Sequence, residues 1–439
     1  MAEQAKLHVV TFGCQMNKLD SEVVAGHLVA AGYALTESSR EADVVLINTC
    51  SVRQHAEDKV WSLLGTLRAR KLRRPDLVLG VIGCMAQKER GAILQRMPHV
   101  DLVCGPMELD RLPELVAEVR QRHERVVAVG EGHVGRVPRA VTRRPNRVQA
   151  FVAVMRGCDN YCAYCVVPYV RGREESRPLA DVVAEVEALV ADGAREVTLL
   201  GQNVNSYGAT LGDGTTLARL LERLDRLPGL ERLRFVTSHP KDASDALFRA
   251  MAGLPRVCPY LHLPAQSGSN RVLRDMNRGY TREHYLERIA RARALVPGVE
   301  VASDFIVGFP GETEAEFEET VDLVRRADFQ NCFVFKYSPR AGTKAAEMAD
   351  DVPWEAKQER NRRLLAVQKA VMRRRNAAMV GRTVEVLVEG TSKRDATKLT
   401  GRTRANHIVA FAGAPRLEGR TVSVEITGFT PLTLFGRMP

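Results

Sequence analysis

Short apolar runs alternate with helical patterns in the first part of the chain, and this order constrains the fold more than any other feature. Between the runs, apolar residues recur at helical spacing in residues 21–33 and in a stretch from Val52 to about Arg70. The runs that predict strands are 7–13, 43–49, 77–83 and 101–105. Strand–helix–strand order is typical of a parallel sheet covered by helices. We therefore predict an α/β domain with a parallel sheet at residues 5–122.

The alternation resumes at Gln149. Helical segments are expected to begin near Leu179, Thr216, Ala243, Thr281 and Thr313. The strand candidates are 150–155, 196–201, 233–237, 259–263, 299–307 and 331–337. Six strand-plus-helix units in roughly 190 residues predict a partial or full barrel of parallel strands. We assign this (βα)6 domain to residues 145–376.

The end of the chain changes character. After a charged helix expected from about Trp354 to Met379, three segments alternate apolar and polar residues and are separated by turn residues: 382–390, 401–411 and 420–430. They predict a small β-barrel at residues 378–439. Upstream, residues 130–147 hold five arginines after position 135 and no acid after Glu131, and we interpret them as a linker, with a solvated loop as the alternative.

Composition narrows the class of protein. Lys and Arg number 64 against 53 Asp and Glu, a net charge of +11, which is compatible with a polyanionic partner although many soluble proteins are modestly basic. No signal peptide and no run of about 18 apolar residues is present, so we expect a cytoplasmic protein without a membrane partner. Nine cysteines, an odd number, favour metal or catalytic use over a disulfide framework.

Cys158, Cys162 and Cys165 form a C-x3-C-x2-C cluster in GCDNYCAYC (157–165). Thiolates suit iron–sulfur clusters, and three ligands for a four-iron cluster leave one iron free to bind a small molecule. The motif follows the first strand of the predicted barrel, at the carboxyl edge where such folds place their sites. A structural zinc site is the alternative, but no further cysteine or histidine follows within twenty residues.

A second set of cysteines lies at the ends of the first three predicted strands. Cys14, Cys50 and Cys84 are separated by 35 and 33 residues, the length of one strand-plus-helix unit. Because parallel strands open on one edge, these residues are expected to converge there. Small buried cysteines are also common in strands, and this is the alternative. Cys104 ends another strand and is a rival or a spare ligand, whereas Cys258 and Cys332 are interpreted as core residues.

Several stretches along the whole chain resemble one family. They are TFGCQMNKLDSE (11–22), INTCSVR (47–53), GCMAQ (83–87), GCDNYCAYCVVPYVRGREESRP (157–178), LLGQNVNSYG (199–208), TSHP (237–240), LHLPAQSGS (261–269) and SDFIVGFPGET (303–313). With the cysteine motif after the first strand of a six-unit barrel, they resemble the methylthiotransferases of the radical S-adenosylmethionine superfamily, and within these the MiaB type. The resemblance implies three domains in the order deduced above, the last of them a TRAM-like RNA-binding barrel.

The resemblance also implies a chemistry. Cys158, Cys162 and Cys165 hold the 4Fe–4S cluster that binds S-adenosylmethionine, with Tyr164 in the place of the aromatic residue before the last cysteine. Cys14, Cys50 and Cys84 hold an auxiliary 4Fe–4S cluster. The implied reaction adds a methylthio group to carbon 2 of N6-(dimethylallyl)adenosine at tRNA position 37, beside the anticodon. S-adenosylmethionine is both methyl donor and radical source, and an electron donor and a sulfur source of unknown identity are further partners.

Contacts to the cofactor and to RNA are predicted from position. Arg402 and Arg404 are the first barrel residues expected to contact tRNA, whereas His407 stands where the family often has a basic residue. The motif GFPGET (308–313) lacks the Lys-Ser/Thr of a phosphate loop, and we exclude that function. Polar residues near strand ends are candidates to bind S-adenosylmethionine, with helix capping or turn formation as the alternative: Gln202, Asn203, Asn205, Ser238, Gln266 and Asp304.

Two alternative functions are considered beside this one. The same chemistry on threonylcarbamoyl-adenosine in tRNA, or on a ribosomal protein aspartate, is the nearest alternative, although GCQMN and GQNVNSYG favour the isopentenylated adenosine. A non-catalytic iron–sulfur protein that binds RNA as a redox sensor is a more distant one, and it leaves the six-unit barrel without a purpose.

Overall fold

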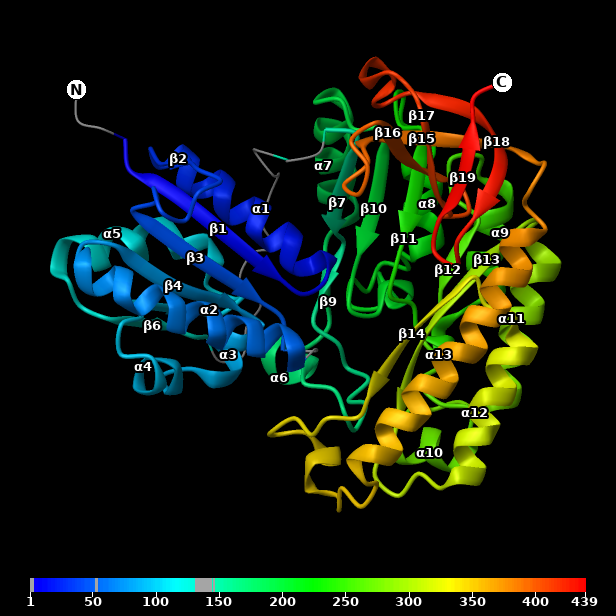
Figure 1. Cartoon of the computed structure of the whole chain (residues 1–439), viewed down its shortest axis with the longest axis horizontal. Helices are drawn as coiled ribbons and strands as arrows, with labels where there is room; N and C mark the ends of the chain where they lie inside the picture. The colour runs from blue at the N-terminus through cyan, green and yellow to red at the C-terminus, as the bar shows by residue number, and fades with distance from the viewer. Residues whose placement is uncertain (1–3, 52–53, 131–143, 145–146) are drawn as a thin grey trace. The chain divides into compact units, whose positions relative to one another are not determined.

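The computed structural model describes residues 4–51, 54–130, 144 and 147–439, which form two compact units (Figure 1). The first contains the described residues of Met1–Pro145 with the segments Met155–Asp159 and Cys165–Arg177, and the second contains the remainder. The two short segments, assigned above to the central domain, thus belong to the first unit. Most of the segment 130–147, interpreted as a linker, lies outside the described residues.

The first unit is built on a six-stranded parallel sheet of order β2-β1-β3-β4-β5-β6. The four predicted strands are confirmed, whereas the two edge strands were not predicted, because two or three residues are too few to give an apolar pattern. The strands are β1 (Lys6–Phe12), β2 (Ala34–Leu35), β3 (Val44–Thr49), β4 (Val78–Gly83), β5 (Leu102–Cys104) and β6 (Val126–Ala128). Every residue of β3 and β4 is buried, as expected of central strands covered on both faces.

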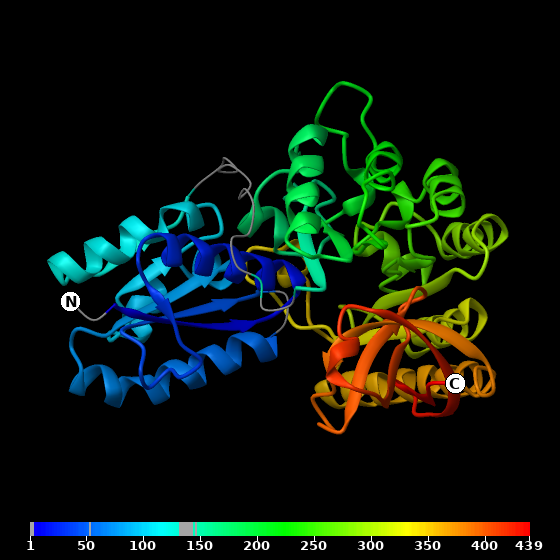
Figure 2. The same ribbon diagram turned by 90° about the horizontal axis from the view of Figure 1, so that it is seen from above.

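Helices cover both faces of this sheet (Figure 2). Helices α1 (Gln15–Ala30) and α5 (Leu112–Arg122) pack on one face. Helices α2 (Gln54–Arg73), α3 (Cys84–Glu89) and α4 (Ala92–Arg96) pack on the other. Helix α1 begins at Gln15 rather than at the predicted Ser21, because its first turns bury the polar residues Asn17 and Asp20 and so lack the apolar spacing that marks a helix.

The second unit contains six parallel strands in two groups of three, of order β11-β10-β7 and β12-β13-β14. A parallel bridge from Leu233 to Val257 joins the groups. Since β7 and β14 are both edges, the described strands form an open, partial barrel. The strands are β7 (Gln149–Ala153), β10 (Glu196–Leu200), β11 (Arg232–Phe235), β12 (Tyr260–His262), β13 (Glu300–Val307) and β14 (Asn331–Lys336). All six were predicted.

The five predicted helices of this barrel begin within two residues of their expected positions, and most are capped by Ser or Thr; the short helix α10 (Asn270–Asp275) was not predicted. The hydroxyls of Thr216, Ser244, Thr281 and Thr313 each accept a hydrogen bond from a first-turn N–H group. The helices are α7 (Leu179–Ala191), α8 (Leu217–Leu224), α9 (Asp245–Gly253), α10 (Asn270–Asp275), α11 (Arg282–Leu295) and α12 (Glu314–Ala327). None of the helices in the described part of the chain is long and apolar enough to cross a membrane.

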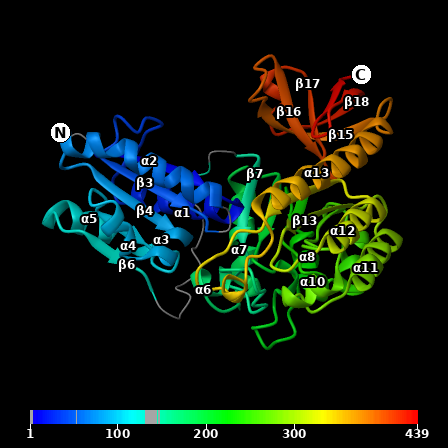
Figure 3. The ribbon, with the colours of Figure 1, turned by 60° about the horizontal axis from the view of Figure 1, so that its bottom comes forward.

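Helix α13 (Trp354–Ala377) leads from the open barrel to a closed barrel of order β15-β16-β17-β19-β18 (Figure 3). Its strands are β15 (Thr383–Thr391), β16 (Lys398–Thr403), β17 (Ile408–Ala412), β18 (Thr421–Phe429) and β19 (Leu434–Arg437). The interpretation of 401–411 as one strand-like segment is wrong. A turn between β16 and β17 interrupts it, with Asn406 at φ +69°, a left-handed conformation that Asn tolerates better than most residues.

Candidate functional site

Three cysteines stand directly beyond three neighbouring strands of the first sheet. The last residues of β1, β3 and β4, which are Phe12, Thr49 and Gly83, lie opposite one another in the parallel register. Cys50 and Cys84 are the next residues after β3 and β4, and Cys14 comes two residues after β1. The register therefore brings Cys14, Cys50 and Cys84 to the same edge, as the sequence predicts.

Two glycines allow the cysteine loops to approach closely. A Cβ atom at Gly13, whose φ is +130°, would lie 2.5 Å from the Cβ of Cys50. One at Gly83, at φ +89°, would lie 2.3 Å from Oδ1 of Asn48. Asn48 is itself buried and donates to the carbonyl of Asn17 at 2.9 Å. Glycine is thus required beside Cys14 and beside Cys84, because any side chain there collides with the neighbouring loop.

The thiols of this triad differ in their tendency to ionise. A hydrogen bond with the Cys50 side chain lowers the pKa of Cys14 to about 6, and the positive charge of Arg171 acts in the same direction. Burial raises the pKa of the Cys84 thiol, against the opposing effect of Arg171. A low pKa favours the thiolate, which is the form that binds iron. Sequence reasoning missed Arg171, since nothing in VVPYVRGRE shows that this arginine is buried.

Within the described residues, no three thiol, imidazole or carboxylate groups are placed to share a single metal ion. This does not conflict with a cluster site, because each thiolate of a 4Fe–4S cluster binds a different iron and the three sulfurs stand apart. The all-cysteine donor set and the glycine-lined approach fit an iron–sulfur cluster.

The three cysteines of the C-x3-C-x2-C motif are divided between the two units. In the first, the N–H of Cys158 donates to the carbonyl of Gly172, and Cys165 lies two residues before α6 (Val167–Arg171). In the second, Arg278 donates to Sγ of Cys162 at 3.2 Å and to the hydroxyl of Tyr164 at 3.3 Å. Arg278 is buried, and its contact with the Cys162 loop was not predicted from the sequence.

Buried polar atoms without a partner gather at the carboxyl ends of β10 and β11. They are Oε1 of Gln202, Oδ1 of Asn203, Oγ of Ser238 and Nε2 of His239. Other atoms of the same residues are bonded: Nδ2 of Asn203 donates to Asp242, and Asn205 exchanges two hydrogen bonds with the backbone of His239. Asn205 thus fixes a turn, whereas the four unpartnered atoms are available to a polar ligand.

Two further candidates lie on β13 and the chain beside it. Gln266 adopts φ +71°, and its backbone bonds to Asp304 and Ile306 at 2.8 and 2.9 Å. Oδ1 of Asp304 lies 3.2 Å from Nε2 of His262. Gln266 therefore lies beyond β12, as predicted, whereas Asp304 lies within β13 (Glu300–Val307) rather than near its end, and its carboxylate has a histidine partner.

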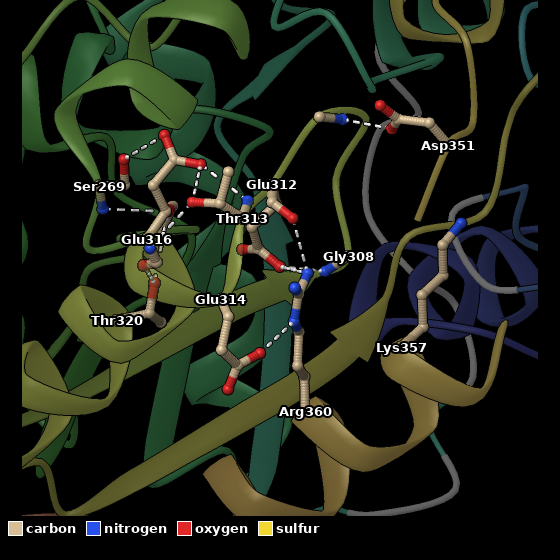
Figure 4. A network of polar contacts seen from close by, with 12 residues as sticks. Ser269, Gly308, Glu312, Thr313, Glu314, Glu316, Thr320, Asp351, Lys357 and Arg360 are labelled. Atoms are coloured by element: carbon tan, nitrogen blue, oxygen red, sulfur yellow. Dashed lines mark hydrogen bonds and ion pairs between the residues drawn. The ribbon is translucent and has the colours of Figure 1, made fainter. Parts of the chain in front are cut away.

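The GFPGET loop after β13 is held by the chain's own carboxylates (Figure 4). The N–H of Gly308 donates to Glu312 at 2.6 Å and that of Gly311 donates to Asp351 at 2.7 Å. Arg360 on α13 reaches the same Glu312 carboxylate at 3.0 Å, and burial raises the pKa of Glu312 to about 7. Because these N–H groups already bind carboxylates, the loop does not offer them to a phosphate, in agreement with the sequence-based exclusion.

The barrel arginines predicted to contact RNA have intramolecular partners. Arg402 pairs with Glu389 at 3.0 Å. Arg404 donates to the carbonyls of Pro255 and Val257 at 2.6 and 2.9 Å. His407 is buried, and burial lowers its pKa to about 4, so it is neutral at pH 7. Their predicted contact with tRNA stays a prediction.

The buried cysteines outside the two triads behave as core residues. Cys104 packs in the apolar cluster formed with α1 and α5, and burial raises its thiol pKa. Cys258 and Cys332 are buried as well, and burial raises the pKa of both thiols. All three are therefore protonated at neutral pH, and Cys104 has the environment of a core side chain.

Comparison with known proteins agrees with this architecture. The chain matches the models of the Uncharacterized protein family UPF0004 over residues 6–105, the Radical SAM superfamily over 152–324 and the TRAM domain over 377–438. Among solved structures it is similar to the radical S-adenosylmethionine methyltransferase TsrM from Kitasatospora setae, with a TM-score of 0.59, 16% identity and coverage of 78% of this chain and 77% of that one. The cobalamin-dependent radical enzyme OxsB follows, with a TM-score of 0.55, 13% identity and coverage of 84% and 56%. At these identities the likeness concerns the fold alone.

Several relatives that share one name with each other match nearly the whole chain. The tRNA-2-methylthio-N(6)-dimethylallyladenosine synthase of Moorella thermoacetica is 49% identical, over 98% of this chain and 97% of its own length. Those of Carboxydothermus hydrogenoformans and Desulforamulus reducens are 47% and 46% identical, over 97% and 99% of this chain and 97% and 96% of their own lengths.

An open barrel of six parallel strands and a match to the corresponding superfamily model define a radical S-adenosylmethionine enzyme, which uses an iron–sulfur cluster and S-adenosylmethionine. Its first domain, with the parallel sheet, matches the UPF0004 model, and its closed C-terminal barrel matches the TRAM model. The chain belongs to the family of tRNA-2-methylthio-N(6)-dimethylallyladenosine synthases.

Proposed function

We propose that this protein inserts a methylthio group at carbon 2 of N6-(dimethylallyl)adenosine at position 37 of tRNA, using two 4Fe–4S clusters. The observation that carries the proposal is the cysteine triad Cys14, Cys50 and Cys84, which stands beyond three strands in register in a chain closely related to synthases of that name. The radical-generating cluster is assigned to Cys158, Cys162 and Cys165, so a second triad of cysteines supports a further cluster that supplies the sulfur.

The reaction explains why such a site is needed. The C–H bond at carbon 2 of adenine is neither acidic nor electrophilic enough for side-chain acid–base catalysis. When bound, the clusters and S-adenosylmethionine supply the radical, the sulfur and the methyl group. The chain supplies ligands, orientation and exclusion of water. Cys158, Cys162 and Cys165 are assigned to the radical-generating cluster, and the other triad to the auxiliary cluster.

The unpartnered atoms at the ends of β10 and β11 support a binding place for S-adenosylmethionine. Oε1 of Gln202 and Oδ1 of Asn203 are acceptors suited to an ammonium group, and the Ser238 hydroxyl both donates and accepts. Gln266, Asp304 and Tyr164 are assigned to the same site, because a backbone hydrogen bond joins Gln266 to Asp304 and Tyr164 shares its partner Arg278 with Cys162. Arg278 holds the Cys162 loop and so positions a ligand rather than reacting.

The tRNA substrate is assigned to the C-terminal barrel and the open mouth of the central barrel. An unpaired anticodon-loop base can be splayed out of its stack and read by a pocket. The TRAM domain match supports contact of the barrel with the flanking phosphates. An electron donor and a sulfur source are required partners, and we assign the protein to the cytoplasm, where tRNA is modified.

Mass analysis of tRNA nucleosides from cells lacking this protein tests the substrate. We expect the isopentenylated adenosine to persist without its methylthio group. Loss of methylthio groups from threonylcarbamoyl-adenosine, or from a ribosomal protein, would assign the alternative substrates instead. With purified protein, reductant and S-adenosylmethionine under anaerobic conditions, absence of 5′-deoxyadenosine would support the redox-sensor alternative.

Iron content tests the two-cluster assignment. Replacing Cys158, Cys162 and Cys165 together with Ala is expected to leave one cluster and roughly half of the iron. Replacing Cys14, Cys50 and Cys84 should give the same iron content but abolish sulfur insertion while 5′-deoxyadenosine formation persists. Unchanged iron in either folded variant contradicts the assignment of that triad.

A further inference from the structure

Arg171 connects two parts of the first unit that are far apart in sequence. It is the last residue of α6, the short helix that begins two residues after Cys165. Its Nε–H donates to Sγ of Cys84 at 3.2 Å, and its NH2 group donates to Oδ2 of Asp20 at 2.6 Å. The side chains of Arg171 and Asp20 are only 5% and 3% exposed. Val166 and Val170 pack against Cys84 on the same side.

Arg171 is the charged group bonded directly to the Cys84 sulfur. Asp20 holds the other end of its guanidinium and also acts on the buried guanidinium of Arg156, which Asp110 and Arg177 influence as well. A buried positive charge is stabilised by a negatively charged group placed against it. A 4Fe–4S cluster held by three thiolates is such an anion.

We propose that Arg171, anchored by Asp20, is a positioning residue that sets the reduction potential of the auxiliary cluster through its hydrogen bond to the Cys84 sulfur. This inference rests on the proposed function, because it takes Cys14, Cys50 and Cys84 as the cluster ligands. Hydrogen bonds to the sulfurs and nearby positive charge favour the reduced cluster, which carries one more negative charge than the oxidised one. Arg171 therefore raises the potential, whereas Asp20 lowers it.

The alternative role for the Arg171–Asp20 pair is purely structural, as a buried ion pair that holds α6 against α1. The two roles give different results when the charges are changed one at a time. Loss of a structural pair reduces folding or cluster content in both variants. Tuning by charge shifts the potential in opposite directions, because the variants remove charges of opposite sign.

The test is redox potentiometry, followed by electron paramagnetic resonance, on the full chain with Cys158, Cys162 and Cys165 replaced by Ala, so that only the auxiliary cluster is observed. Arg171→Gln is expected to lower the ratio of reduced to oxidised cluster at a fixed potential about tenfold, which is 59 mV for a one-electron couple. Asp20→Asn is expected to raise that ratio by a smaller factor. Arg122→Gln, at an exposed arginine paired with Glu118 on α5, is the matched control and should leave the ratio unchanged.

Unchanged ratios in both variants, or shifts in the same direction, would overturn the proposal. If Arg171→Gln assembles no cluster, Arg171→Lys takes its place: it keeps the charge but not the Nε–H group, and a smaller decrease is expected, whereas no decrease counts against the proposal. A triple-alanine protein that folds but binds no iron would contradict the ligand assignment itself. A normal cluster with an unshifted potential would contradict only the role of Arg171.

Discussion

The guanidinium group of Arg234, on β11, donates a hydrogen bond of 2.7 Å to the backbone carbonyl of Arg404, in the turn between β16 and β17. A second bond of 2.7 Å reaches the carbonyl of Thr403. Arg404 in turn donates to the carbonyls of Pro255 and Val257, before β12. The C-terminal barrel is therefore fixed to the central barrel by a reciprocal exchange of guanidinium and backbone groups.

Arg234→Gln is expected to destabilise this junction. Arg234 also pairs with Glu196 at 2.9 Å, and both side chains are almost fully buried. Removing one partner of a buried pair leaves an uncompensated charge and costs about 3–5 kcal/mol. The measurements are denaturant unfolding and proteolysis of the segment that joins α13 to β15. Arg223→Gln, at an exposed position on α8, should change neither, and equal stability of the two variants would contradict the expectation.

The strands of the first sheet and the convergence of Cys14, Cys50 and Cys84 were predictable from the length of a strand-plus-helix unit, whereas Cys158, Cys162 and Cys165 form a local motif. Phe12, Thr49 and Gly83 end their strands in register, so Cys14, Cys50 and Cys84 had to meet once the sheet was parallel. Likewise, the starts of three helices were predictable from their N-cap residues, which are Thr216, Thr281 and Thr313. Periodic spacing and caps are local signals, and the sequence carries them directly.

The buried arginines were not predictable, because their partners are distant in sequence. Arg171 meets Asp20 and Cys84, and Arg278 meets Cys162, across separations that no periodicity reveals. The ion pairs of the arginine-dense helix α13 were not predictable for the same reason. Four of its arginines bind carboxylates of the same unit: Arg360, Arg363, Arg374 and Arg375.

The salt dependence of tRNA binding is expected to depend on the loop between β15 and β16. Lys393 and Arg394 are exposed there, whereas Arg404 is bound to backbone carbonyls. Replacing both Lys393 and Arg394 with Gln should lower the magnitude of the slope of log K against log salt by about 1.4, at about 0.7 per lost phosphate contact. Arg404→Gln should lower stability with little change in slope. A slope that falls only in Arg404→Gln would instead support the sequence-based assignment.

Deleting the chain beyond Gly381 extends this test to the whole barrel. We expect a larger loss of affinity and a flatter salt dependence than in the double variant, because every phosphate contact of the barrel is removed. Unaltered tRNA affinity in a folded truncated protein would refute the RNA-binding role of the barrel.

Gly13→Ala is expected to remove the auxiliary cluster selectively. Its Cβ would lie 2.5 Å from the Cβ of Cys50 at a backbone conformation that L-residues rarely adopt. Displacement of Cys14 or Cys50 should leave roughly half of the iron, measured per folded chain. Gly32→Ala is the matched control, since Gly32 also has a positive φ of +98° but nothing lies within 4 Å of its Cβ position. Equal iron in the two variants would show that the close approach is not required.

Acid is expected to weaken the C-terminal barrel through His407. Burial lowers the pKa of His407 from 6.5 to about 4, so the folded state binds this proton less readily than the unfolded state. Its contribution to stability is therefore complete above pH 6.5 and is lost as the pH falls toward 4, by up to roughly 3 kcal/mol. Urea unfolding at pH 7.5 and 4.5 measures it. His407→Gln should lose less stability than the parent chain over this interval, and an equal loss would rule out His407 as the cause.

Ser238→Ala is expected to change stability and cofactor affinity in opposite directions. The Ser238 hydroxyl is buried without a partner, so its removal relieves a desolvation cost and should raise the unfolding free energy by about 1 kcal/mol. If the hydroxyl binds S-adenosylmethionine, the same change should weaken binding about tenfold, as measured by equilibrium dialysis under anaerobic conditions. Ser206→Ala is the control: its hydroxyl donates to the carbonyl of Asn203 at 2.8 Å, so its loss should lower stability. A stabilised Ser238→Ala protein with unchanged affinity would show that S-adenosylmethionine does not bind the Ser238 hydroxyl. The cofactor would then lie away from this strand end.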